Sequence, residues 1–359
     1  MPGDRMPGDR MPGEGISDAR IEPHWQAAFA GLFELCAARP SETITILAET
    51  RSRQLNLALA RGALGDLQLA HDIVTVPSKP PSAGPIIRST GASTALTGES
   101  DALARLCRSD LVIDLTVEGL MHAPETASIL KSGARIMTIS NEHPDILARL
   151  VPDPAMKDIV RDAVAACRGA ARMTVTSPAG TDLEVDITEM PTVGVWGWTD
   201  RPGTLAHWPG GLVVGFPHAG CCNGRIIFAP GDMNLTFKRY FESEVSCVVT
   251  ADFITEISGT GTDARLMKTY LDGFADPLAF ATSHVGWGLN PAARYEALTM
   301  YDREDLNGTE LRALAGNFLY STGANEFAGR FTEGHFDLPM MGCTISLDGR
   351  VMVRDGVPV

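Results

Sequence analysis

The sequence predicts an α/β first half built on a parallel sheet, followed by an α+β second half of mostly antiparallel strands. Up to about Gly169, short β-branched apolar runs alternate with helical segments, as strands buried on both faces of a parallel sheet do. Beyond Gly169 the chain becomes rich in glycine and proline, and strand candidates follow one another with few helices between them. We therefore expect an α/β domain at 16–169 and an α+β domain at 170–359.

Four apolar runs in the first half predict the parallel strands. They span residues 43–49, 71–77, 110–116 and 134–140. Helical segments come before and between them, with the clearest at 24–38, 51–64 and 99–109. The glycine pattern GxGxxG does not follow the first run, so the sequence gives no support for a nucleotide site.

Hairpins dominate the prediction for the second half. Residues 172–188 contain two strand candidates around a Pro-Ala-Gly turn, and Asp348-Gly349 is the strongest local hairpin signal in the chain. Further strands are expected at 211–217, 224–230 and 243–258, and helices at 262–273 and 310–319.

Charge and composition exclude several functional classes. The net charge of −14 argues against nucleic acid and anionic membranes as partners, because binding to either needs clustered lysine and arginine. No run approaches the roughly 20 apolar residues of a membrane span. The seven cysteines include no CxxC pair and are expected to be reduced thiols, which fits a cytoplasmic protein. Residues 1–15 form a Pro/Gly repeat without the apolar core of a secretory signal, and we expect them to be disordered.

A His-x-Asp pair near the carboxyl end is the first candidate for chemistry. If the surrounding stretch is extended, His335 and Asp337 project from the same face of a strand and can offer an imidazole and a carboxylate to one metal ion. The best candidate for a third ligand is His284, just before a Gly-Trp-Gly segment expected to form a turn. Two histidines and one carboxylate match the facial triad of non-haem Fe(II) oxygenases.

Four motifs carry a resemblance to a known family. GTDLEVDIT, NGRIIFAPGD, SHVGWGLNPAARY and EGHFDLPMMGCTISLDGRVMVRDG occur in that order between residues 180 and 356. They resemble the 2,5-dihydroxypyridine 5,6-dioxygenase branch of the aminopeptidase T (M29) superfamily. The peptidases hold two metals with several carboxylates, but this chain has Arg225 and His284 at two of those positions. An arginine at a dication site is electrostatically unfavourable, so the resemblance implies one Fe(II) held by His284, His335 and Asp337.

The resemblance also implies a reaction. Fe(II) and O2 would open the ring of a hydroxylated pyridine in an extradiol manner, with 2,5-dihydroxypyridine converted to N-formylmaleamate as the favoured case. The base that deprotonates the substrate hydroxyl is expected to be His122, which follows the run at 110–116 where open α/β sheets place ligands. His207 and His218 are candidates for holding the ring nitrogen or oxygens. Members of the family look oligomeric, so a homo-oligomer is expected.

Two other functions stay open on the sequence. The same ligands could activate water in a metallohydrolase, such as an aminopeptidase or amidohydrolase. A binding module with a decayed site is the alternative outside enzymes. Arg225 and His284 count against the peptidase, and the intact His335-x-Asp337 pair counts against decay. For His207 and His218, a plain loop-surface role is also open.

Overall fold

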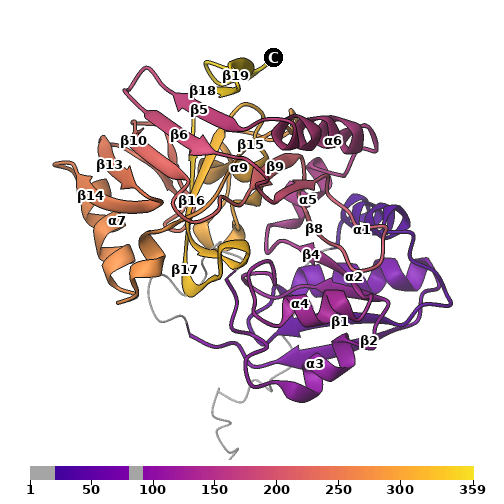
Figure 1. Ribbon diagram of the computed structural model, residues 1–359. Coiled ribbons are helices and arrows are strands. Elements are labelled where there is room, and N and C mark those ends of the chain that lie inside the picture. Colours follow the sequence, from indigo (N-terminus) through magenta and orange to yellow (C-terminus); the bar gives the residue numbers. More distant parts are fainter. Residues whose placement is uncertain (1–20, 81–91) are drawn as a thin grey trace, which may run out of the picture.

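The computed structural model describes residues 21–80 and 92–359, so the predicted disorder of 1–15 falls outside the described residues. Figure 1 shows two parts, a lower one around a parallel sheet and an upper one of antiparallel strands. This arrangement confirms the two kinds of region expected from the sequence. Within the described residues, no helix is long and apolar enough to cross a membrane.

The parallel sheet has the strand order β2-β1-β3-β4-β8, and every neighbouring pair is parallel. Its strands are β1 (Ile44–Glu49), β2 (His71–Val76), β3 (Leu111–Asp114), β4 (Arg135–Ile139) and β8 (Leu205–Trp208). All residues of β1, β3 and β4 are buried, as expected for strands covered on both faces. The helices of this half are α1 (Pro23–Leu35), α2 (Gln54–Asp66), α3 (Ser100–Leu106), α4 (Thr126–Lys131), α5 (Pro144–Arg149) and α6 (Ala155–Arg168).

Two antiparallel sheets form the second part. The larger has the order β14-β13-β10-β6-β5-β18-β19-β20 and the smaller β17-β16-β15-β9-β7. The larger contains β5 (Arg172–Thr176), β6 (Asp182–Asp186), β10 (Cys222–Phe228), β13 (Val245–Thr250), β14 (Phe253–Ser258), β18 (Thr344–Leu347), β19 (Arg350–Arg354) and β20 (Val357–Pro358). The smaller contains β7 (Thr192–Val195), β9 (Leu212–Gly215), β15 (Thr282–Gly288), β16 (Phe318–Asn325) and β17 (Arg330–Met340). Both predicted hairpins, β5–β6 and β18–β19, are confirmed.

Shorter elements complete this part. A two-stranded ribbon pairs β11 (Met233–Asn234) with β12 (Arg239–Tyr240). The helices are α7 (Thr262–Asp272), α8 (Ala297–Met300) and α9 (Thr309–Ala313), with short 3-10 turns η1 (Pro277–Phe280), η2 (Arg303–Asp305) and η3 (Glu326–Ala328).

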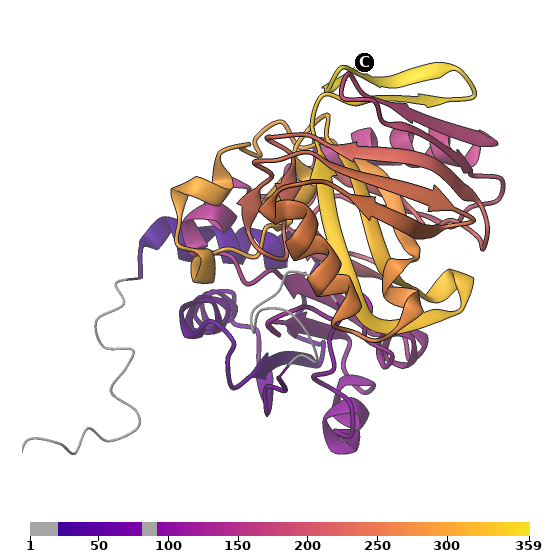
Figure 2. The ribbon, with the colours of Figure 1, turned by 90° about the vertical axis from the view of Figure 1, so that its left-hand side faces the viewer.

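The smaller antiparallel sheet lies between two hydrophobic cores. One face of it packs against the larger sheet, where Val213, Tyr320 and Phe336 share a core with residues of β5, β6, β10 and β13. On the opposite face, Leu212 and Leu319 belong to the core of the parallel-sheet half. Adjacent residues on a strand point to opposite faces, so neighbours such as Leu212 and Val213 serve different cores. Figure 2 shows the antiparallel sheets stacked on the parallel-sheet half.

Two local expectations are wrong. The Gly-Trp-Gly segment forms no turn but continues strand β15, which pairs with β9. The glycine at 286 serves close packing of these strands, because a Cβ there would lie 2.0 Å from the Val213 carbonyl oxygen. The helix expected at 310–319 ends at Ala313. Asn317 ends it by donating from its amide to the carbonyls of Leu311 and Arg312, at 2.6 and 3.1 Å.

Candidate metal and substrate site

Strand β17 presents His335 and Asp337 on the face that looks toward the parallel-sheet half. The intervening Phe336 and the following Leu338 belong to the opposite core, which fixes the direction of the two polar side chains. His335 is 1% exposed and Asp337 2%. Opposite Asp337 on β16, Ser321 donates a hydrogen bond to the carboxylate Oδ1. The same-face geometry expected from the sequence is therefore present in the strand.

His284 reaches the same place from strand β15. Its Nε2 lies 3.5 Å from Asp337 Oδ1, and the Nε2 of His335 lies 3.2 Å from that oxygen. The Nδ1 atoms of both rings are buried without a hydrogen-bond partner among the described residues. The three side chains predicted as metal ligands thus meet, although strand β16 lies between β15 and the edge strand β17.

The ionisation of these groups suits a metal ion. Burial alone would raise the pKa of Asp337, but the charge of the Arg312 guanidinium holds it well below its ordinary value. Burial lowers the pKa of His284 and of His335, against the opposing effect of the Asp337 carboxylate. Neutral imidazole and ionised carboxylate are the forms that bind metals, so this donor set fits a divalent cation without first losing protons.

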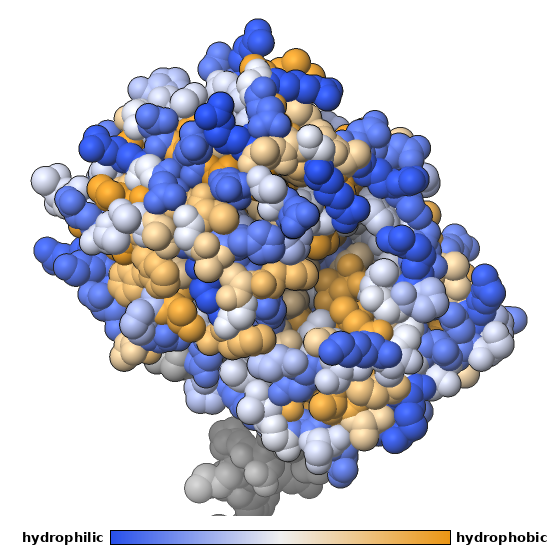
Figure 3. All heavy atoms as spheres, viewed as in Figure 1, coloured by the Kyte–Doolittle hydropathy of each residue, from blue (hydrophilic) through white to orange (hydrophobic). Residues whose placement is uncertain are grey.

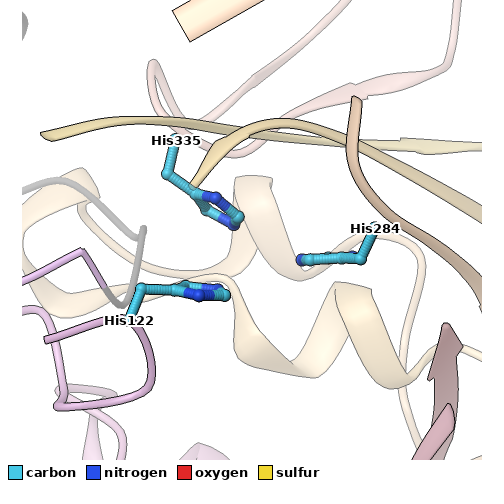
Figure 4. Close-up of side chains that lie close together, drawn as sticks. All are labelled: His122, His284 and His335. Atoms are coloured by element: carbon cyan, nitrogen blue, oxygen red, sulfur yellow. The ribbon is translucent and has the colours of Figure 1, made fainter. Parts of the chain in front are cut away.

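His122 comes to the site from the other half of the molecule. It follows β3, in a loop held by the buried Asp114 carboxylate, which accepts hydrogen bonds from Thr116, Leu120 and Thr138. The His122 ring centroid lies 4.4 Å from that of His335 and 6.1 Å from that of His284. Figure 4 shows the three rings turned toward one common space. One ligand atom from each of these three buried histidines lies within 4.8 Å of the other two.

A cavity of about 280 Å³ opens beside these side chains. Its apolar wall includes Val193, Val195, Leu205, Leu212, Val214 and Leu319, and two phenylalanines, Phe216 and Phe327, stand in contact with a ring-centroid distance of 4.9 Å. Figure 3 shows hydrophobic side chains in a hollow between the two parts of the molecule. The volume and lining suit a small planar ring.

The structure brings His207 to this cavity but leaves His218 outside it. His207, on β8, donates from Nδ1 to the Pro209 carbonyl at 2.7 Å, and burial lowers its pKa to about 4. The ring is therefore neutral near pH 7 with its lone pair on Nε2, ready to accept a hydrogen bond. His218 is exposed, does not line the cavity and lies with Nε2 3.2 Å from the Glu189 carbonyl. Its expected role in substrate binding has no structural support.

Several site residues carried no signal in the sequence. Arg312, at the end of α9, donates from Nε to Asp337 Oδ2 at 2.6 Å. Glu326, in η3, lies with Oε1 3.2 Å from His122 Nδ1. Glu142 is fully buried and accepts from the backbone N–H groups of 307–309, which lead into α9 and contribute Asn307 and Thr309 to the cavity wall. Each of these residues contacts a partner more than 20 positions away in the sequence, and no local sequence pattern predicts such a contact.

A buried group of side chains that could hold a metal ion, beside a largely apolar cavity, indicates a metal-dependent enzyme for a small molecule. A family model described as 2,5-dihydroxypyridine 5,6-dioxygenase matches residues 24–359, and the chain belongs to this family. It is 37% identical over 265 residues to the 2,5-dihydroxypyridine 5,6-dioxygenase of Pseudomonas putida KT2440, covering 73% of this chain and 75% of that protein. The expected class of ring-cleaving dioxygenase is thereby confirmed.

Solved structures agree with the family. The 2,5-dihydroxypyridine dioxygenase from Pseudomonas putida KT2440 superposes with a TM-score of 0.87 at 32% identity, covering 93% of this chain and 96% of that one. Wild-type AmpT from Thermus thermophilus gives a TM-score of 0.62 at 13% identity, covering 94% and 99%. The second likeness is one of fold alone, and the metallohydrolase alternative is not favoured.

Proposed function

We propose that this protein uses one Fe(II) ion, held by His284, His335 and Asp337, to open the ring of 2,5-dihydroxypyridine with O2. The observation that carries the proposal is that two imidazole Nε2 atoms each lie within 3.5 Å of one carboxylate oxygen, beside a cavity of ring size. The product expected is N-formylmaleamate, which retains every carbon, nitrogen and oxygen atom of the substrate, gains both atoms of O2 and is formed with release of one proton.

Spacing favours Asp337 over His122 as the third ligand. Donor atoms that share a metal at about 2.1 Å, with bond angles between 90° and 110°, lie about 3.0–3.4 Å apart. Asp337 Oδ1 lies 3.2 Å from His335 Nε2, within this range, and 3.5 Å from His284 Nε2, just beyond it. For the three histidines, the ligand atoms lie within 4.8 Å of one another, and the ring centroid of His122 lies 6.1 Å from that of His284. We therefore assign His122 to the substrate rather than to the metal.

The remaining side chains would bind and deprotonate the substrate. When bound, iron supplies the one-electron chemistry by which O2 can react with the ring. His122 takes the proton of a ring hydroxyl, which raises the electron density of the ring. His207 Nε2 accepts a hydrogen bond from the ring nitrogen or a second hydroxyl. The apolar wall excludes water, and Arg312 keeps the Asp337 carboxylate oriented through its Oδ2 atom.

Anaerobic reconstitution tests the proposal. Protein loaded with Fe(II) should consume one O2 for each 2,5-dihydroxypyridine, and Zn(II) protein should consume none. The variants His284→Ala and Asp337→Ala should lose bound iron, whereas His122→Ala should keep iron and lose turnover. Turnover by Zn(II) protein without oxygen uptake would rule out the dioxygenase, and iron retention by Asp337→Ala would remove that residue from the ligand set.

A further inference from the structure

A short turn between β16 and β17 links the two halves of the molecule at the site. It contains η3 and delivers Glu326 to His122, two residues that lie 204 positions apart in sequence. The carboxylate oxygens lie 3.2 and 3.4 Å from His122 Nδ1. The His122 side chain is 3% exposed and that of Glu326 29%, so bulk water does not dominate the contact.

The turn itself is fixed by a buried side chain. Asn325 is completely buried, accepts from the Ala328 backbone N–H at 3.1 Å and donates to the Pro217 carbonyl at 3.0 Å. Gly329 then reverses the chain with a φ of 70°, a conformation that favours glycine. Glu326 therefore sits on an anchored piece of backbone.

The contact distinguishes His122 from the two histidines assigned to the metal. Only His122 has a carboxylate on its Nδ1, since the Nδ1 atoms of His284 and His335 have no partner in the described part of the chain. An ionised carboxylate can only accept, so the hydrogen of the neutral ring must lie on Nδ1. The lone pair is then on Nε2, the atom on the far side of the ring from Glu326.

We propose that Glu326 is a positioning residue that holds His122 in the tautomer and orientation needed to accept the substrate proton. The inference rests on the proposed function, in which His122 is the base. In the step, the O–H bond of a ring hydroxyl breaks, its proton forms a bond to His122 Nε2, and the electron pair stays on the substrate oxygen. The Glu326 carboxylate offsets the charge of the resulting imidazolium.

A carboxylate behind a histidine also occurs at metal ligands, so the experiment must separate the two roles. Iron content, KM and kcat would be measured for Glu326→Ala and Glu326→Gln, with Glu256→Ala as the control. Glu256 is an exposed glutamate on β14 that does not line the cavity. Circular dichroism and thermal unfolding would confirm that each variant folds.

Glu326→Ala should keep its iron and its KM within about twofold and lose roughly 10- to 100-fold in kcat, part of what a general base contributes. Glu326→Gln keeps an amide oxygen that can accept from Nδ1–H, and it should recover to within about tenfold of the wild type. Iron loss by Glu326→Ala would make His122 a ligand and overturn the inference. An unchanged kcat in Glu326→Ala, or a Gln variant as slow as the Ala variant, would overturn it too. A wild-type protein without oxygen uptake would instead refute the proposed function.

Discussion

Replacing Glu142 should damage both stability and activity, although its carboxylate bonds to the backbone before α9 and to none of the three proposed metal ligands. Its carboxylate accepts from Asn307 N–H at 2.7 Å and from the N–H groups of Gly308 and Thr309, each at 2.8 Å. These groups belong to the amino end of α9, where no side chain of the helix's own N-cap residue provides a cap. The distant carboxylate therefore caps the helix.

The magnitude follows from the number of donors left without a partner. Glu142 is 0% exposed, so Glu142→Ala leaves three buried N–H groups without a hydrogen-bond acceptor, at a cost of about 1–3 kcal/mol each. We expect the free energy of unfolding to fall by at least about 3 kcal/mol, a large part of the usual 5–15 kcal/mol. Glu142→Gln can still accept through one oxygen but turns an N–H toward a donor, so its loss should be about 1–3 kcal/mol.

Urea unfolding at pH 7 measures these differences, and steady-state turnover measures the effect on the site. Because Asn307 and Thr309 line the cavity, folded Glu142→Gln protein should show a raised KM. The exposed Glu256→Gln serves as the matched control. If the free energy of unfolding of Glu142→Ala lies within about 1 kcal/mol of the wild-type value, the carboxylate does not cap the helix and the reasoning fails.

Three further substitutions test other parts of the structure. Phe327→Ala should raise KM about 3- to 10-fold with kcat nearly unchanged, because Phe327 lines the cavity. As the control, Phe331 is 60% exposed and lies outside the cavity, so Phe331→Ala should change neither constant. Equal effects of the two substitutions would contradict this prediction. The pKa of His207 is about 4 in the folded protein and 6.5 in the unfolded chain. The unfolded chain therefore binds the proton more tightly, and the free energy of unfolding falls as the pH falls from 6.5 to 4. Urea titrations should show His207→Asn losing about 2–3 kcal/mol less than the wild type between pH 7 and 4.5, and equal losses would refute the assignment. Gly286→Ala should lower the melting temperature by the equivalent of roughly 1–3 kcal/mol, since its Cβ would meet the Val213 carbonyl, and an unchanged value would show that the strands can separate.

Sequence patterns were sufficient where a single strand or hairpin decides the outcome. The buried runs of β1, β3 and β4 follow from continuous apolar composition, and the β18–β19 hairpin follows from Asp348-Gly349, both of which adopt positive φ. The common face of His335 and Asp337 follows from the two-residue period of any strand. The parallel and antiparallel regions were predictable because helical segments separate the strands of the first half, whereas the strands of the second half follow one another with few helices between them.

Contacts across the fold were not predictable from such patterns. His284 was proposed as a ligand because of an expected turn that does not form, and no local rule brings Glu326 or Arg312 to the site. The helix expected at 310–319 failed because the apolar run from Phe318 is a strand buried on both faces, which periodicity alone does not distinguish from a buried helix. The domain boundary at 169/170, the cytoplasmic location and the homo-oligomeric state stay predictions.

The return of β8 to the first sheet has a consequence for any attempt to divide this protein. β8 lies beyond Gly169, yet it pairs in parallel with β4 from Ile136↔Leu205 to Ile139↔Trp208. A fragment that stopped at Gly169 would leave β4, all of whose residues are buried, as an open edge of unpaired N–H and C=O groups. Such an edge recruits strands from other copies, so the separated half is expected to aggregate rather than remain a folded monomer. We therefore expect that the two halves need to be expressed as one chain.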